Sequence, residues 1–178
     1  KIVIHDCRDE KSLVSLGNLP SGGELRINHL AVECDLLLSE GFIEPHFFAG
    51  FSGGRKSVLP GIAGEKTVMG NHCAKFISSP HARAGILEGN PIHKDMAYAA
   101  EKAKLKFIVN VVLNSEKKVI HAVAGYPLKA HAEGCRFIGG LCRIKVPESQ
   151  IVVTGNGGYP LDQNIYQSVK GMSAAEAV

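Results

Sequence analysis

Three residues in and just after one glycine-rich stretch carry side chains that can do chemistry near neutral pH. His46 and Lys56 lie within residues 41–61, which contain five glycines, and His72 follows shortly after. Histidine exchanges protons near pH 7 and ligates metals, while a neutral lysine is a nucleophile. The stretch has no repeating apolar face, so we predict a turn-rich loop, the kind of element that usually presents reactive groups.

Each of these residues also has an ordinary structural interpretation. His46 would be a loop histidine bonded to the backbone, Lys56 a solvated lysine, and His72 a surface residue of a helix. For any one of them alone, the structural role is the more common one. The six other histidines show no partner pattern and receive no functional assignment: His5, His29, His81, His93, His121 and His131.

The nearest simple motif is the phosphate-binding loop G-x-x-x-x-G-K-[ST], because residues 50–57 read GFSGGRKS. Arg55 stands where that motif requires its last glycine, and a bulky side chain there would obstruct the approach of phosphate to the backbone. The preceding run 42–45 is short and contains Pro45, unlike the strand that such a loop follows. We therefore do not predict a nucleoside triphosphatase.

Five longer motifs occur in order along the chain: EPH at 44–46, AGFSGGRK at 49–56, LPG at 59–61, NH at 71–72 and GGYPLDQNIYQSVKG at 157–171. With these motifs, nearly the whole sequence resembles the nickel-pincer nucleotide-dependent lactate racemase family. The resemblance implies an isomerase, a racemase or epimerase of a lactate-like 2-hydroxy acid, that works by proton-coupled hydride transfer. The alternative is a non-racemase homologue, or a cofactor-free binding domain of the same fold.

The resemblance also implies roles for individual residues. Lys56 matches the lysine joined covalently to a pyridinium-3,5-dithiocarboxylate-type mononucleotide, the pincer that holds nickel. His72 matches the protein ligand of the nickel, and His46 matches one of two histidines that exchange the substrate hydroxyl proton. Three further residues match positions around substrate and cofactor: Tyr166, Gln167 and Lys170. Transient contact with cofactor-biosynthesis proteins is implied as well.

The chemistry explains why these residue types suit such a site. Imidazole is a good single protein ligand for square-planar nickel, since sulfur and carbon donors come from the cofactor. Lysine must be neutral to act as a nucleophile, which partial burial and a neighbouring cation such as Arg55 favour. The second acid–base histidine of the family has no counterpart in these residues. We therefore expect an internal fragment of a longer protein, inactive as a racemase by itself.

Composition is that of an ordinary globular domain of 178 residues, 45% of them hydrophobic. Basic residues exceed acidic ones by three, and they form no stripe interleaved with aromatic residues, so nucleic-acid binding is not predicted. No apolar run approaches the roughly 20 residues that span a bilayer, so no membrane partner is predicted. The five cysteines include no C-x-x-C pair. This usage favours free thiols and a cytoplasmic location.

The element pattern predicts an α/β fold with a mixed, largely parallel sheet and flanking helices. A buried parallel strand within 35–38 would deliver the loop of residues 41–61 at its C-terminal end, where α/β sheets place ligands. The pattern predicts strands at 2–4, 35–38 and 151–154, a hairpin of 107–113 and 119–124, and helices at 9–16, 64–77, 91–104, 130–143 and from about 162.

A domain boundary is predicted near Pro147. Residues 1–146 would form the C-terminal part of an N-terminal cofactor-binding α/β domain, and residues 147–178 the start of a C-terminal α/β domain. Gly157, Gly158 and Pro160 most simply shape a turn before the last helix. A cofactor phosphate near that helix start is the alternative, because helix N-termini attract anions.

Overall fold

A computed structural model describes residues 1–159 and 162–178, without the side chain of Tyr166. The chain divides into two compact units, Lys1–Leu141 and Cys142–Val178. The boundary predicted near Pro147 concerns the domains of the complete protein and stays a prediction. All five cysteines are free thiols. Among the described residues, no helix is both long and apolar enough to cross a membrane.

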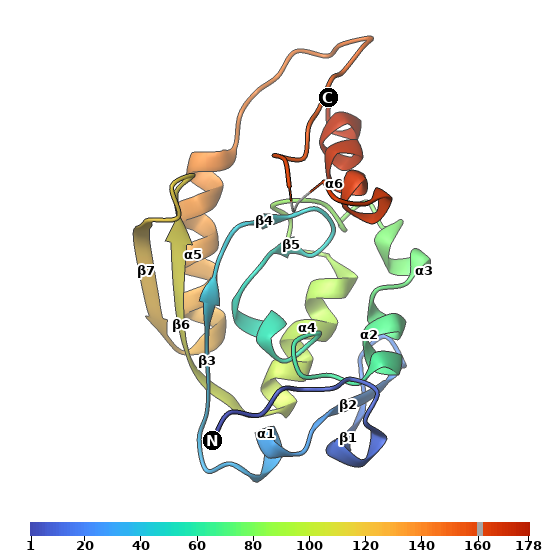
Figure 1. Ribbon diagram of the computed structural model, residues 1–178, viewed down its shortest axis with the longest axis vertical. Helices are drawn as coiled ribbons and strands as arrows, with labels where there is room; N and C mark the ends of the chain where they lie inside the picture. Colours follow the sequence, from blue (N-terminus) through green and yellow to red (C-terminus); the bar gives the residue numbers. More distant parts are fainter. Residues whose placement is uncertain (160–161) are drawn as a thin grey trace. The chain divides into compact units, whose positions relative to one another are not determined.

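The first unit has the mixed α/β fold that the sequence predicted (Figure 1). Its main sheet has the order β3 (Leu37–Phe42), β6 (Leu105–Leu113) and β7 (Val119–Gly125). β3 and β6 run parallel, with Ser39 opposite Ile108, whereas β6 and β7 form the predicted antiparallel hairpin. The parallel pair arises because α4 (Pro91–Lys102) lies between the strands in sequence and crosses over from one to the other.

Helices pack on the sheet through apolar side chains that include Ile108 and Val112 of β6, both buried. α4 begins as predicted, with Pro91 in its first turn and the Asn90 side chain accepting hydrogen bonds from the backbone N–H groups of Ile92 and His93. α5 (Pro127–Cys142) packs on β7, where the Phe137 ring stacks on His121. The second unit contains α6 (Ile165–Glu176), close to the helix predicted from about residue 162.

An antiparallel hairpin of β1 (Leu13–Asn18) and β2 (Glu24–Asn28) lies near the N-terminus, after a short 3₁₀ turn, η1 (Glu10–Ser12). The remaining short elements are α1 (Leu30–Glu33), β4 (Pro45–His46), β5 (Gly50–Phe51), the 3₁₀ turn η2 (Gly54–Ser57), α2 (Glu65–Asn71) and α3 (Ala74–Ile77). β4 pairs with β5 in a second small antiparallel ribbon.

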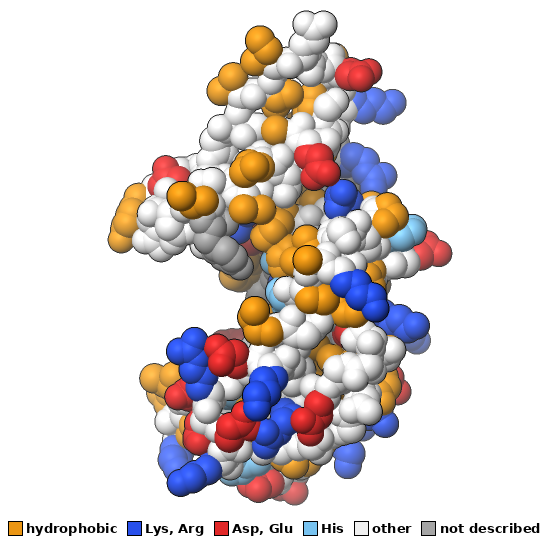
Figure 2. All heavy atoms as spheres, turned by 90° about the vertical axis from the view of Figure 1, so that its right-hand side faces the viewer, with side chains coloured by type: hydrophobic (Ala, Val, Ile, Leu, Met, Phe, Trp, Pro, Cys, Tyr) orange, Lys and Arg blue, Asp and Glu red, His pale blue; other side chains and the backbone are white. Residues whose placement is uncertain are grey.

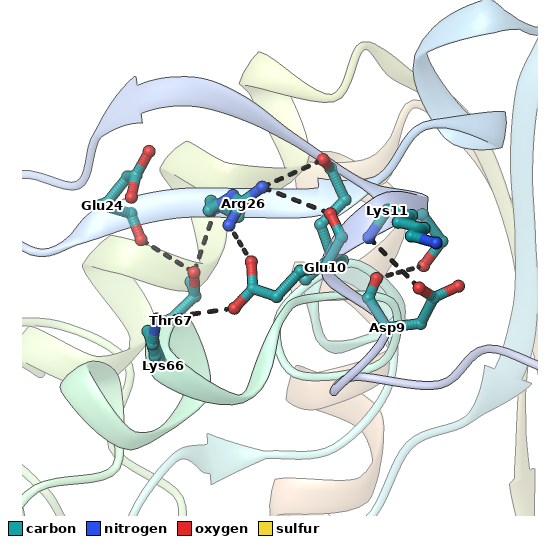
Figure 3. A network of polar contacts seen from close by, with 9 residues as sticks. Asp9, Glu10, Lys11, Glu24, Arg26, Lys66 and Thr67 are labelled. Carbon is teal, nitrogen blue, oxygen red and sulfur yellow. Dashed lines mark hydrogen bonds and ion pairs between the residues drawn. The ribbon is translucent and has the colours of Figure 1, made fainter.

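Polar contacts fasten the hairpin to α2, as Figure 3 shows. Arg26 of β2 forms an ion pair with Glu10, which also pairs with Lys66 of α2 at 3.5 Å. The Thr67 hydroxyl accepts a hydrogen bond from the Arg26 backbone N–H and donates one to the Glu24 carbonyl. The network fixes the helix that leads to His72.

Acidic and basic side chains are interspersed over the lower part of the view in Figure 2, without a large area of one sign.

Several sequence predictions of secondary structure were wrong. Residues 2–4 and 151–154 are not strands, because no strand pairs with them in the described chain, and Ile2 and Ile151 are more than four-fifths exposed. The predicted helix 9–16 is instead η1 followed by β1, since pairing with β2 overrides local propensity. The predicted helix 64–77 is broken into α2 and α3 at His72, whose φ of −92° and ψ of 48° are not helical.

Candidate functional site

A tight ribbon positions His46. β4 and β5 place His46 opposite Gly50, so the chain reverses over three residues. Gly50 has a φ of +78°, and a Cβ atom at this position would lie 2.4 Å from the Ile86 carbonyl oxygen. Glycine is therefore required by both backbone conformation and space. β3 ends at Phe42, so the ribbon follows the C-terminal end of a parallel strand, as the sequence predicted. The prediction that this strand lies at 35–38 and is buried was wrong, because it spans Leu37–Phe42 and Leu38 is 53% exposed.

The side chains of His46, Lys56 and His72 gather around the buried ring of Phe48. The His46 ring meets Phe48 edge-on at a centroid distance of 4.6 Å, and the His72 ring does so at 5.1 Å. The Lys56 Nζ atom lies over the same ring, 6.0 Å from its centroid. The structure thus brings together three residues that lie up to 26 positions apart in the sequence.

His72 is held in the neutral form. Burial, together with a smaller effect of the positive charge of Lys56, lowers its pKa to about 4. At pH 7 the ring therefore keeps a free lone pair, which is the form that ligates metals. Its Nδ1 atom is buried and has no hydrogen-bond partner among the described residues. A donor atom in this state fits a metal ligand.

A buried amide supports the backbone at His72. Asn71 is fully buried and donates from Nδ2 to Asp95 Oδ2 at 3.3 Å. The other carboxylate oxygen of Asp95 accepts the Ser21 backbone N–H at 3.1 Å. The end of α2 is thereby tied to α4 and to the β1–β2 turn. The ring of His72 projects from a well-supported point of the chain.

His46 has an assignable tautomer. Its Nδ1 atom lies 3.3 Å from the backbone N–H of Ala49 and accepts a hydrogen bond from it. A neutral imidazole that accepts at Nδ1 carries its proton on Nε2. In this tautomer Nε2 can donate a hydrogen bond but has no lone pair to accept a proton. The tautomer that accepts a proton at Nε2 carries its own proton on Nδ1 and therefore loses the contact with Ala49.

Arg55 is the largest fully buried side chain of the described residues and adjoins Lys56 in η2. Its guanidinium donates to the carbonyl oxygens of Ala49 and Gly53 and to Nδ1 of His93. Its Nη1 also lies 2.8 Å from Nε2 of His131, an atom that lies 2.8 Å from the Ser52 carbonyl oxygen as well. Burial lowers the pKa of Arg55 to about 10, so the side chain stays charged at pH 7. This places a fixed positive charge directly beside Lys56 in sequence.

The other predicted site residues belong to the second unit. Gln167 and Lys170 lie on α6, where Gln167 donates its backbone N–H to the Asn164 side chain at 3.1 Å. The Gln167 Oε1 atom is buried without a hydrogen-bond partner in the described chain, and Lys170 is exposed. The Tyr166 side chain and Pro160 lie outside the described residues. Gly157 and Gly158 both have positive φ, consistent with the predicted turn.

Sequence patterns gave no signal for several residues that build this site. Phe48 read as one of several apolar loop residues, and His93 and His131 received no assignment. Asn110 of β6 accepts the Gly54 backbone N–H at 2.8 Å, 56 positions away in sequence. The two histidines lie 38 and 76 positions from Arg55. Such contacts have no local spacing by which a single sequence would show them.

Fold and site together define a mixed α/β unit that presents a lysine and two histidines after the end of a parallel strand. No group of three or more His, Cys, Asp or Glu side chains that could hold a metal ion occurs among the described residues. The family models of the lactate racemase N-terminal and C-terminal domains match residues 1–85 and 144–178. The chain belongs to the lactate racemase family.

Known relatives agree with this assignment. Lactate racemase from Thermoanaerobacterium thermosaccharolyticum is 59% identical over 177 residues, and that from Lactiplantibacillus plantarum is 60% identical. Each match covers 99% of this chain but 42% of the relative, so the chain spans about two-fifths of their length.

Two solved structures were also matched. The lactate racemase apoprotein from T. thermosaccharolyticum matches with a TM-score of 0.96 and 60% identity, over 98% of this chain and 42% of that one. A Thermotoga maritima protein matches with a TM-score of 0.63 and 28% identity, over 76% of this chain and 38% of its own.

Proposed function

We propose that the complete protein is a racemase of lactate or a closely related 2-hydroxy acid, and that this chain supplies the part that anchors its cofactor. The observation that carries the proposal is the gathering of His46, Lys56 and a neutral His72 around Phe48. Membership of the lactate racemase family supports the same activity. In this proposal, the complete protein acts in the cytoplasm and receives its cofactor from biosynthesis proteins.

Lys56 and His72 would hold a nickel-pincer mononucleotide of the pyridinium-3,5-dithiocarboxylate type. Lys56 would form the covalent bond, for which its amine must be neutral. His72 would be the protein ligand of nickel, since it is neutral at pH 7 and has a buried ring nitrogen without a hydrogen-bond partner among the described residues. The chemistry that the bound nickel-pincer mononucleotide would supply is to accept a hydride and to return it.

His46 would exchange the hydroxyl proton of the substrate on one face. With Nδ1 accepting from Ala49, the ring begins as a donor at Nε2. To take the hydroxyl proton at Nε2, the neutral ring must carry its own proton on Nδ1, so the 3.3 Å contact from the Ala49 N–H would have to be released and the ring proton exchanged through solvent. Taking the hydroxyl proton would then give an imidazolium, which returns that proton from Nε2 when the hydroxyl group forms again. Tyr166, Gln167 and Lys170 would bind around substrate and cofactor.

The deciding experiment is a measurement on the full-length protein, purified from a host that makes the cofactor. Intact mass, peptide mapping and nickel analysis should show one covalent addition, located at Lys56, with about one nickel per modified subunit. The matched control is Lys66→Arg, at an exposed lysine, which should keep both. Unmodified protein without nickel would overturn the proposal and favour a homologue that is not a racemase.

A further inference from the structure

The guanidinium of Arg55 joins three segments of the first unit. Nη2 donates to the Ala49 carbonyl at 2.8 Å, and Nη1 lies 3.3 Å from the Gly53 carbonyl. These contacts hold both ends of residues 49–53, which we call the β5 loop. Nε donates to Nδ1 of His93 on α4 at 2.9 Å, and Nη1 lies 2.8 Å from Nε2 of His131 on α5. The same Nε2 lies 2.8 Å from the Ser52 carbonyl oxygen, so His131 contacts both the guanidinium and the loop. We call Arg55, His93 and His131 the Arg55 clamp.

The clamp is unusual because every polar group that the described chain places against this buried cation is uncharged. Arg55 is 1% exposed, and no carboxylate of the described chain pairs with it. Burial and the charge of Arg55 lower the pKa of His93 to about 4 and that of His131 to about 3, so both rings are neutral at pH 7. A buried charge without a counter-ion destabilises a fold. If this position only had to be filled, an apolar side chain would do so with a smaller loss of stability.

The geometry of the loop shows what the guanidinium achieves. Its planar fork holds five donors over a wide span, whereas a lysine ammonium has three donors on a single nitrogen atom and cannot reach acceptors so far apart. Arg55 is followed directly by Lys56 within η2, so fixing the backbone at Ala49, Gly53 and Arg55 fixes the point from which Lys56 extends. The His131 ring also packs against Gly54, where a Cβ atom would lie 2.7 Å from Cδ2 of the ring.

We propose that Arg55 is a positioning residue for Lys56, and that His93 and His131 act through it by holding the guanidinium against the β5 loop. The inference rests on the proposed function, in which Lys56 anchors the cofactor. Neither Arg55 nor the two histidines touch the substrate in this scheme. Their effect is on where the anchored cofactor lies relative to His46 and His72, which converge with Lys56 on Phe48.

The test uses full-length protein from a cofactor-producing host and compares four variants with the parent. Arg55→Lys keeps the charge but loses the fork, and His93→Leu removes one acceptor with little change in volume. His93→Gln keeps an acceptor, and Arg136→Lys repeats the first change at an exposed arginine of α5. For each protein, the racemisation rate is divided by the amount of subunit that carries the covalent addition at Lys56.

This ratio separates positioning from folding. A role in folding alone lowers the yield of loaded protein but leaves the rate per loaded subunit unchanged. We expect Arg55→Lys and His93→Leu to lower the rate per loaded subunit by about 10- to 100-fold, the range expected for a small misplacement of reacting groups. Arg136→Lys should match the parent, and His93→Gln should recover most of the rate lost in His93→Leu. Parent-like rates per loaded subunit in Arg55→Lys and His93→Leu would overturn the inference.

A second measurement keeps the inference testable if the parent carries no cofactor. In cofactor-free protein, the labelling rates of Lys56 and Lys66 by an amine-reactive reagent are compared by peptide mapping. Release of the loop in Arg55→Lys should raise the rate at Lys56 several-fold and leave that at Lys66 unchanged. Equal rates at Lys56 in parent and variant would refute the clamp, whereas missing cofactor with altered labelling would refute the proposed function alone.

Discussion

Acid should destabilise the protein through His131 by an amount that can be worked out. Burial lowers the pKa of this histidine from 6.5 to about 3, with a second contribution from the charge of Arg55. Because the folded-state pKa lies below the unfolded-state value, the unfolded chain binds the proton first. The stability that depends on neutral His131 is therefore complete above the unfolded pKa and is lost as the pH falls from about 6.5 towards about 3.

Between about pH 7 and about pH 5, the folded ring stays neutral while the unfolded ring becomes protonated. The corresponding loss in the free energy of unfolding is roughly 2 kcal/mol for this one group. Urea unfolding of cofactor-free full-length protein at both pH values measures the total loss. His131→Gln cannot titrate, so its loss over the same interval should be smaller than that of the parent by about that amount.

The matched control is His81→Gln, at an exposed histidine, whose loss should equal that of the parent. His131→Gln is expected to be less stable than the parent at neutral pH, which does not affect the comparison of slopes. The reasoning is refuted if His131→Gln and the parent lose the same stability between the two pH values.

Three further outcomes are expected. Lys56→Arg should abolish the covalent mass addition and racemisation while unfolding within about 0.5 kcal/mol of the parent, and retained activity would exclude the tether. His46→Ala should lower turnover by roughly 10²- to 10⁴-fold with nickel content unchanged, and joint loss of both would make His46 structural or a ligand. Gly54→Ala should destabilise by roughly 1–3 kcal/mol more than Gly85→Ala in urea unfolding, because both have positive φ but only Gly54 faces His131 closely. Equal values would argue against that contact.

Local patterns determined a substantial part of the fold. Pro91 after a capping Asn90 marked the start of α4, and two apolar runs around a polar turn predicted the β6–β7 hairpin. Both features are encoded by neighbouring residues, which is why a single sequence reveals them. The motifs around His46, Lys56 and His72 likewise indicated the family, and the family models match the chain. The chemical roles of these residues remain predictions.

Only the tertiary structure decided how those residues are held. Phe48 becomes the centre of the site because the ends of β4, η2 and α2 meet at its ring. The break at His72 and the pairing of β1 with β2 both contradicted the helices that local propensity favoured. The partners of Arg55 come from α4 and α5, far away in sequence. Long-range hydrogen bonds and burial select such arrangements, and neither leaves a periodic trace in the residues that it joins.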